Sequence, residues 1–88
     1  MRTTDKRTAV VTLENGLALT LDYAILVEDT YFGENYGISV ISRQSGERVH
    51  ICGITPSSEK IYELYERMIR YCVTPVVARD IVEDWLVR

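Results

Sequence analysis

The chain has 88 residues, of which 47% are hydrophobic and 26% are charged, and its formal net charge at pH 7 is −3. This length suits a single domain, and the apolar share is too high for an intrinsically disordered chain. The ten basic residues are dispersed among thirteen acidic ones, whereas nucleic-acid binders gather a basic excess on one face, so we expect no nucleic-acid partner.

Membrane insertion and secretion are not indicated by the apolar segments. No apolar run reaches the 18 residues of a membrane span, and the apolar stretch after the basic start is too short for a secretion signal. We therefore expect a cytoplasmic protein with no membrane partner.

The first half of the chain has the two-residue period of β-strands. Residues 1–7 lack this pattern and are expected to form a flexible tail. Asn15-Gly16 supplies the positive φ angles of a tight hairpin turn, while residues 28–35 read as a polar loop and residues 44–47 as a turn. The predicted strands are 8–13, 17–29, 36–43 and 48–55.

Alternation divides the strand side chains between two faces. The face predicted to form the core carries Val11, Leu13, Leu19, Leu21, Tyr23, Ile25, Val27, Tyr36, Ile38, Val40, Val49 and Ile51. The opposite face is mixed, with Val10, Thr12, Thr20, Asp22, Ala24, Leu26, Ser39, Ile41, Arg43, Arg48, His50 and Cys52. Burial on one side is typical of an antiparallel meander that helices cover on that side.

The second half has the 3.6-residue period of helices. Thr55 or Ser57 can cap a first helix near Pro56, and Thr74-Pro75 can start a second one. The first helix has a predicted buried stripe and, on its other side, the expected ion pairs Glu63–Arg67 and Glu66–Arg70. The stripe consists of Ile61, Leu64, Tyr65, Met68, Ile69 and Cys72.

Together these elements predict an α+β fold in one domain. Residues 8–55 form a four-stranded antiparallel β-meander, and residues 56–88 form a C-terminal two-helix hairpin packed on one sheet face.

The last helix separates apolar from acidic side chains. One half carries Val77, Ala78, Ile81, Val82, Trp85 and Leu86. The other carries Asp80, Glu83 and Asp84, with expected pairs Arg79–Glu83 and Asp84–Arg88. We expect the acids to be a hydrated surface, with contact to a partner as the alternative; a metal site needs more oxygen ligands than this segment offers. Trp85 is expected to anchor the helix on the core rather than to bind a ligand.

The residues with chemical potential are few. His50 and Cys52 lie on one strand face, but same-face neighbours are too far apart for a thiolate–imidazole pair, and no orienting group is evident. Cys52 and Cys72 are expected to be reduced, half-buried thiols, since two cysteines are no disulfide framework. No phosphate-binding glycine loop or zinc ligand set is present. We therefore expect no catalytic residue, no metal and no cofactor.

Three other surfaces offer binding alternatives. Arg43 and Arg48 flank the 44–47 turn, can face each other and, with His50, form a candidate anion or ligand site, although such arginines usually extend into water. Tyr31 and Phe32 either fold over an open end of the core, which we expect, or remain exposed as an interaction surface. The mixed sheet face or an edge strand could support a homodimer.

Several segments resemble a family of short uncharacterised proteins from Gram-positive bacteria. They are the strand YGISVIS (36–42), the helix entry at Ile54-Thr55 and the terminal box Asp80-Ile81-Val82-Glu83-Asp84-Trp85-Leu86. The resemblance spans residues 23–86 and implies a bacterial cytosolic setting, without an assigned activity.

The expected function is that of a small non-enzymatic protein-interaction module. Its partner is either another protein or a second copy of the chain. The alternative is a ligand-binding regulatory domain that uses the open sheet face, followed by a Cys52-dependent enzyme.

Overall fold

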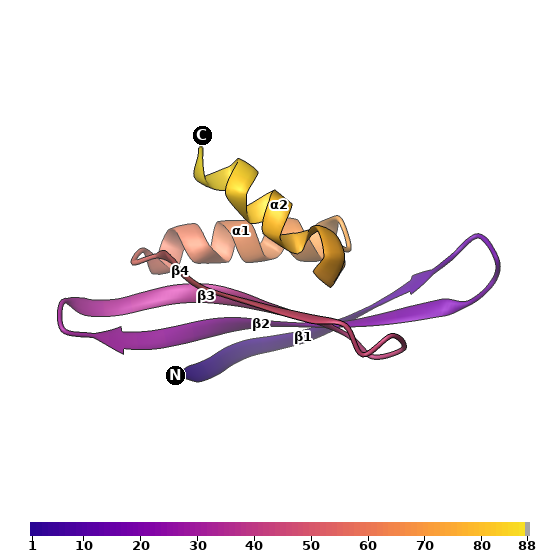
Figure 1. Ribbon diagram of the computed structural model, residues 1–88, viewed down its shortest axis with the longest axis horizontal. Helices are drawn as coiled ribbons and strands as arrows, with labels where there is room; N and C mark the ends of the chain where they lie inside the picture. Colours follow the sequence, from indigo (N-terminus) through magenta and orange to yellow (C-terminus); the bar gives the residue numbers. More distant parts are fainter. Residues whose placement is uncertain (88) are drawn as a thin grey trace.

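The computed structural model describes residues 1–87 and confirms the predicted α+β fold (Figure 1). A four-stranded antiparallel sheet precedes two helices, and each strand pairs with its neighbour in sequence in the order β1-β2-β3-β4. The elements are β1 (Arg2–Thr12), β2 (Ala18–Thr30), β3 (Gly33–Ser42), β4 (Arg48–Thr55), α1 (Ser58–Arg70) and α2 (Pro75–Leu86).

The two helices lie on the same face of the sheet, and the opposite face is open (Figure 1). The molecule is 47 Å long, and the β1–β2 and β2–β3 hairpins extend beyond the helices at opposite ends (Figure 1). Leu13, which we predicted in the core, is therefore exposed on the overhanging β1–β2 hairpin.

The core lies between the sheet and the helices and follows the predicted alternation. Its strand residues are Leu21, Tyr23, Ile25, Val27, Ile38, Val40, Ile51 and Ile54, and its α1 residues are Ile61, Leu64, Tyr65 and Met68. The buried hydroxyl of Tyr23 donates a hydrogen bond of 2.8 Å to the carbonyl of Val73, between the two helices. This bond ties the middle of β2 to the turn that joins α1 and α2.

A glycine allows the close approach of β4 to β3. A Cβ atom built on Gly37 would lie 2.1 Å from the carbonyl oxygen of Ile51. The β3–β4 register shifts between Tyr36 and Ile38, so the glycine stands where the ladder is irregular. Its missing side chain is what lets the two backbones meet there.

The N-terminus corrects one expectation. Residues 1–7 were predicted as a tail, but β1 begins at Arg2 and pairs with β2 along its length. A bulge interrupts the pairing between Thr4 and Arg7, and Asp5 within it has a φ of 52°. The Tyr62 hydroxyl donates to the Asp5 carboxylate, and the Tyr65 hydroxyl donates to the Asp5 carbonyl oxygen. Contacts with α1 thus hold a segment whose own sequence has no strand pattern.

Two side chains next to the bulge also join β1 to α1. Arg7 forms an ion pair of 2.8 Å with Glu66, and its guanidinium lies 5.6 Å from the ring centre of Tyr65. Glu66 was predicted to pair with Arg70, and the structure places it against the strand instead. The predicted Glu63–Arg67 and Arg79–Glu83 pairs are also absent from the described part of the chain. Asp84–Arg88 lies outside the described residues.

The two helices begin differently. The Ser57 hydroxyl accepts a hydrogen bond of 3.2 Å from the backbone N–H of Lys60, which caps α1 as predicted. Thr74 occupies the same position before α2, with Pro75 in the first turn, but its side chain makes no capping bond. Val77 and Leu86, which were placed on the buried half of α2, are exposed. Trp85 is partly buried and packs against the core, as expected of an anchor.

Candidate functional site

The tip of the β2–β3 hairpin carries the two most exposed aromatic side chains among the described residues. The predicted loop of residues 28–35 is instead a two-residue connection, because β2 continues to Thr30 and β3 begins at Gly33. Tyr31 and Phe32 are 96% and 95% exposed. They do not cover the core, so that expectation was wrong, and the alternative of an exposed pair describes the structure.

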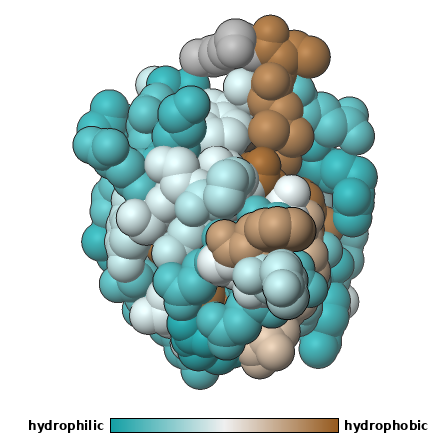
Figure 2. Space-filling view, turned by 90° about the vertical axis from the view of Figure 1, so that its left-hand side faces the viewer, coloured by the Kyte–Doolittle hydropathy of each residue, from teal (hydrophilic) through white to brown (hydrophobic). Residues whose placement is uncertain are grey.

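The tip has a defined shape. The rings of Tyr31 and Phe32 pack edge to face, with centroids 5.2 Å apart and an interplanar angle of 78°. Gly33 has a φ of 121°, which a side chain would oppose, and its carbonyl accepts a 2.6 Å hydrogen bond from the Thr30 hydroxyl. Figure 2 looks onto this end of the molecule and shows small groups of hydrophobic side chains within a mostly hydrophilic surface.

Charged side chains brace the strands behind the tip. Arg2 of β1 donates a 2.7 Å hydrogen bond to Asp29 of β2 and also pairs with Glu34 of β3. Glu34 accepts a bond of 2.9 Å from the Tyr36 hydroxyl, which raises the pKa of that tyrosine. The base of the tip is acidic on balance, because Arg2 pairs with both Asp29 and Glu34, and Glu28 adjoins Asp29 in the sequence.

The open sheet face does not assemble the predicted arginine pair. Arg48 lies opposite Ile41 in the β3–β4 register, whereas Arg43 points to β2. Both side-chain hydrogen bonds of Arg43, of 2.7 and 2.9 Å, go to the carboxylate of Asp22. Together with a bond from the Thr8 hydroxyl, they hold the pKa of Asp22 below its ordinary value. The Arg43 charge is thus balanced within the protein.

A depression of about 380 Å³ lies on this open face, beside the β1 bulge. Arg43 and His50 line it, and Lys6 adds another basic group; Ala24, Ser39 and Ile41 lie among its other lining residues. Arg48 is not part of the lining. The depression therefore brings together two of the three residues of the candidate anion site, beside the carboxylate of Asp22.

The acidic side chains of α2 are exposed, as the amphipathic pattern predicts. Asp80, Glu83 and Asp84 face outward and, with Ile81 and Val87, border an open surface hollow. Nothing in their geometry draws them into a common site.

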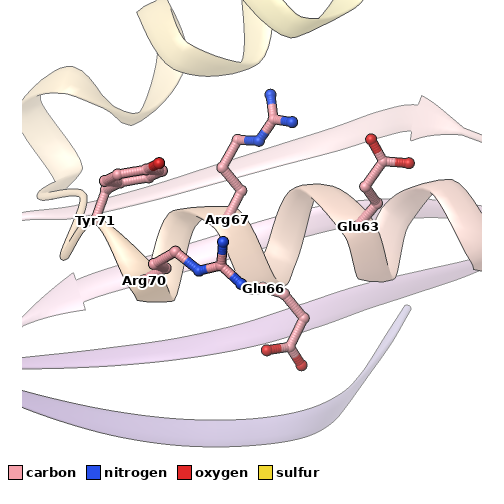
Figure 3. Close-up of a pocket in the computed structure, with 5 residues that line it drawn as sticks. All are labelled: Glu63, Glu66, Arg67, Arg70 and Tyr71. Atoms are coloured by element: carbon pink, nitrogen blue, oxygen red, sulfur yellow. The ribbon is translucent and has the colours of Figure 1, made fainter.

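A further surface groove runs along α1. It has a volume of about 530 Å³ and is lined by Glu63, Glu66, Arg67, Arg70 and Tyr71. Figure 3 shows these side chains fanning out from one helix, with Arg67 directed toward α2 and Glu66 directed away from it. Groups of both charge signs point in different directions, so they converge on no common point where a ligand could bind.

The cysteines form no site together with His50. Both thiols are free, and Cys52 is exposed on the open face, where we had expected it to be half-buried; Cys72 is partly buried. The Cys52 thiol lies 3.8 Å from the Met1 sulfur. Among residues 1–87, no group of three or more potential ligands could hold a metal ion. No helix in this part of the chain is long and apolar enough to cross a membrane.

Comparison with known proteins places this chain in a family. Residues 3–88 match the model of a family of unknown function (DUF6514), and the chain belongs to that family. The match includes the N-terminal hairpin, which the resemblance seen in the sequence did not cover. No curated protein and no solved structure matches significantly.

Proposed function

We propose that this protein is a non-enzymatic interaction module of the bacterial cytosol that binds another protein through the Tyr31–Phe32 tip. The observation that supports it is the almost complete exposure of two adjacent aromatic rings on a two-residue turn. Aromatic side chains are enriched among the residues that dominate binding energy at protein interfaces. A soluble domain gains nothing in stability from leaving two such rings in water.

The tip is also well prepared for binding. The edge-to-face packing, the Thr30–Gly33 hydrogen bond and the Arg2 ion pairs restrict it before a partner arrives. Restriction of this kind lowers the entropy lost on association.

The surrounding charges indicate the chemistry of the partner. With Glu28, Asp29 and Glu34 behind the tip and only Arg2 opposing them there, a complementary surface has an apolar pocket with a basic rim. The same acids disfavour nucleic acid and anionic lipid surfaces as partners, because both carry negative charge.

Affinity capture from a lysate of the source organism tests this proposal. The bait is the intact chain, and the test variant is Tyr31→Ser/Phe32→Ser. Tyr71→Ser is the matched control, since Tyr71 is 69% exposed but lies at the end of α1. A second control is the charge reversal Asp80→Lys/Asp84→Lys.

A specific partner should be lost with the tip variant and kept with Tyr71→Ser. Binding of the purified partner should then weaken at least roughly tenfold on loss of the tip, as expected for an aromatic anchor. Retention of every captured protein by the tip variant would contradict the proposal. Loss only on reversal of Asp80 and Asp84 would move the contact to α2.

The open-face depression supports a second candidate function, the binding of a small anionic ligand beside Lys6, Arg43 and His50. Such a ligand must compete with Asp22 for Arg43. A thermal-shift screen of anionic metabolites, repeated with Lys6→Ala and with Arg48→Ala as a control outside the lining, distinguishes this function from binding at the tip.

A further inference from the structure

Strand β1 is an outer strand of the sheet, and half of it lacks the features that usually protect such an edge. Residues 8–13, with the sequence TAVVTL, are uncharged and rich in β-branched side chains. Val10 in the middle of this stretch is 66% exposed, although it lies in regular strand. An exposed edge with this composition is a template for pairing with another strand.

The backbone groups that point outward can be identified from the hairpin. The N–H of Leu13 donates to the carbonyl of Leu17 at 2.8 Å, so Leu13 directs its donor toward β2. The inward and outward directions alternate along an antiparallel strand, and the register is regular from Thr12 back to Arg7. The outward N–H and C=O groups are therefore those of Thr8, Val10 and Thr12.

Other edge segments are protected. The first half of β1 contains the bulge, charged residues and the contacts of Asp5 with α1. On the opposite edge, β4 carries Arg48 and His50, and its pairing with β3 is irregular near Gly37. Charges and bulges are the usual means by which edge strands avoid pairing. Their absence from residues 8–13 distinguishes this segment.

We propose that β1 pairs antiparallel with β1 of a second copy about a two-fold axis at Val10, which joins the two sheets into one of eight strands. Val10 then lies opposite its own copy, Thr8 opposite Thr12, and Ala9 opposite Val11. Each opposed pair points to the same side of the sheet, as antiparallel pairing requires. The outward backbone groups of Thr8, Val10 and Thr12 meet one another in this register.

Charge complementarity favours this register over its neighbours. With the axis at Val10, Lys6 and Arg7 of one copy approach Leu13 and Glu14 of the other, so that unlike charges meet at both ends. An axis at Ala9 places Lys6 opposite Thr12, and an axis at Val11 places Glu14 opposite Thr8. Of these three registers, only the one centred on Val10 brings a basic residue opposite Glu14.

This inference goes beyond the proposed function and uses different residues. In the dimer the two Tyr31–Phe32 tips lie at opposite ends of the joined sheet, because the paired strands run antiparallel. A partner with two matching pockets is then bound with increased avidity.

Sedimentation equilibrium over a range of concentrations tests the dimer against the 10.1 kDa mass of the single chain. The native chain should approach twice this mass. Val10→Glu and Val10→Lys each place like charges opposite one another at the axis, and each should raise the dimer dissociation constant roughly tenfold or more. An equimolar mixture of the two variants should recover the dimer, since unlike charges then meet.

The matched control is Val76→Glu, because Val76 is 67% exposed but lies on α2. This variant should dimerise as the native chain does. The tip variant Tyr31→Ser/Phe32→Ser should also dimerise normally, so that loss of partner binding can be distinguished from loss of the dimer. A native chain that stays at 10.1 kDa at millimolar concentration would overturn the inference. So would Val10 variants that dimerise unchanged, or a mixture that stays monomeric.

Discussion

The two helices cover the same sheet face, but they contribute unequally to the core. Four residues of the predicted α1 stripe, Ile61, Leu64, Tyr65 and Met68, are inaccessible to solvent, while Ile69 and Cys72 are partly buried. A serine side chain caps the first turn of the helix. In the middle of helix α2, Ala78 and Val82 are buried against the core, but Val76, Val77 and Leu86 are exposed. The helix has no side-chain cap. Helix α1 is thus the structural centre of the fold, while α2 closes one side of it through β4.

The largest difference between the helices should appear on truncation of their apolar side chains. Leu64→Ala removes a fully buried group from α1 and should lower the free energy of unfolding by about 2–5 kcal/mol. Val77→Ala on α2 should change it by less than about 0.5 kcal/mol, because the side chain is exposed. Urea unfolding followed by circular dichroism measures both; equal losses would show that the helices contribute equally.

Trp85 tests how firmly α2 is anchored. Trp85→Ala should lower the free energy of unfolding by about 1–3 kcal/mol, less than the loss for a fully buried tryptophan, because the ring is only partly covered. The same urea titration applies. An unchanged midpoint would mean that the other core contacts of α2, those of Ala78, Ile81 and Val82, are sufficient to hold the helix.

The tyrosine hydroxyls of α1 should produce a loss of stability at high pH. Burial raises the pKa of Tyr65 from 10.0 to about 12. Since the folded state holds this proton more tightly, the contribution is complete below pH 10 and is lost as the pH rises toward 12. Tyr65→Phe should cost about 1 kcal/mol at neutral pH by removing the bonds to Asp5 and Tyr23, and should flatten the alkaline decline.

Thermal unfolding at stepwise pH values measures this decline. Tyr71→Phe is its control, because Tyr71 is exposed at the end of the same helix. If Tyr65→Phe lost stability between pH 10 and 12 as steeply as the native chain, the decline would have another origin; Tyr23, whose pKa burial also raises, would be the next group to replace.

The smallest expected difference concerns the helix caps. Ser57→Ala should lower the free energy of unfolding by about 1 kcal/mol, since it removes the hydrogen bond to the Lys60 N–H. Thr74→Ala should cost no more than a few tenths, because its hydroxyl makes no such bond. Thermal unfolding of the two variants measures this difference. Equal losses of stability would indicate that Thr74 caps α2 in solution.

Periodicity was sufficient to predict the central part of this fold. The alternation in β2 and β3 and the 3.6-residue stripe of α1 arise from burial, which leaves a strong mark on the order of apolar residues. The Asn15-Gly16 turn was predictable because few residue pairs accept its backbone angles; Gly16 has a φ of 84°. These features depend on neighbouring residues or on one repeating pattern of apolar residues, and both can be read directly from the sequence.

The N-terminal half of β1 could not be predicted in this way. Its polar sequence is held by residues distant in the chain, with Tyr62 and Tyr65 contacting Asp5 and Arg2 contacting Asp29. The same limitation applies to Glu66, which bonds Arg7 across the fold rather than Arg70 along its own helix. Spacing along a helix shows which oppositely charged residues can pair within that helix. It does not show whether a residue from another element, brought close by folding, will form the ion pair instead.

The residues of the candidate site were predicted from the sequence, but the two-residue turn that exposes them was not. Tyr31 and Phe32 were recognised as an aromatic pair in a polar segment, yet the length of the flanking strands was hidden because Glu28, Asp29, Glu34 and Asn35 are poor strand formers. Arg43 and Arg48 were separated by a register that turn residues alone do not specify. The uncharged edge at residues 8–13 was visible in the sequence, but its position at the sheet border became clear only with the strand order.

The close packing around Gly37 has an evolutionary consequence. Every amino acid other than glycine brings a Cβ atom, and at this position that atom would overlap the carbonyl of Ile51. We therefore expect substitutions of Gly37 to be selected against, whereas its neighbours in β3 can exchange one aliphatic residue for another. In divergent descendants of this gene, a glycine followed by alternating branched side chains is the landmark from which an alignment should be started.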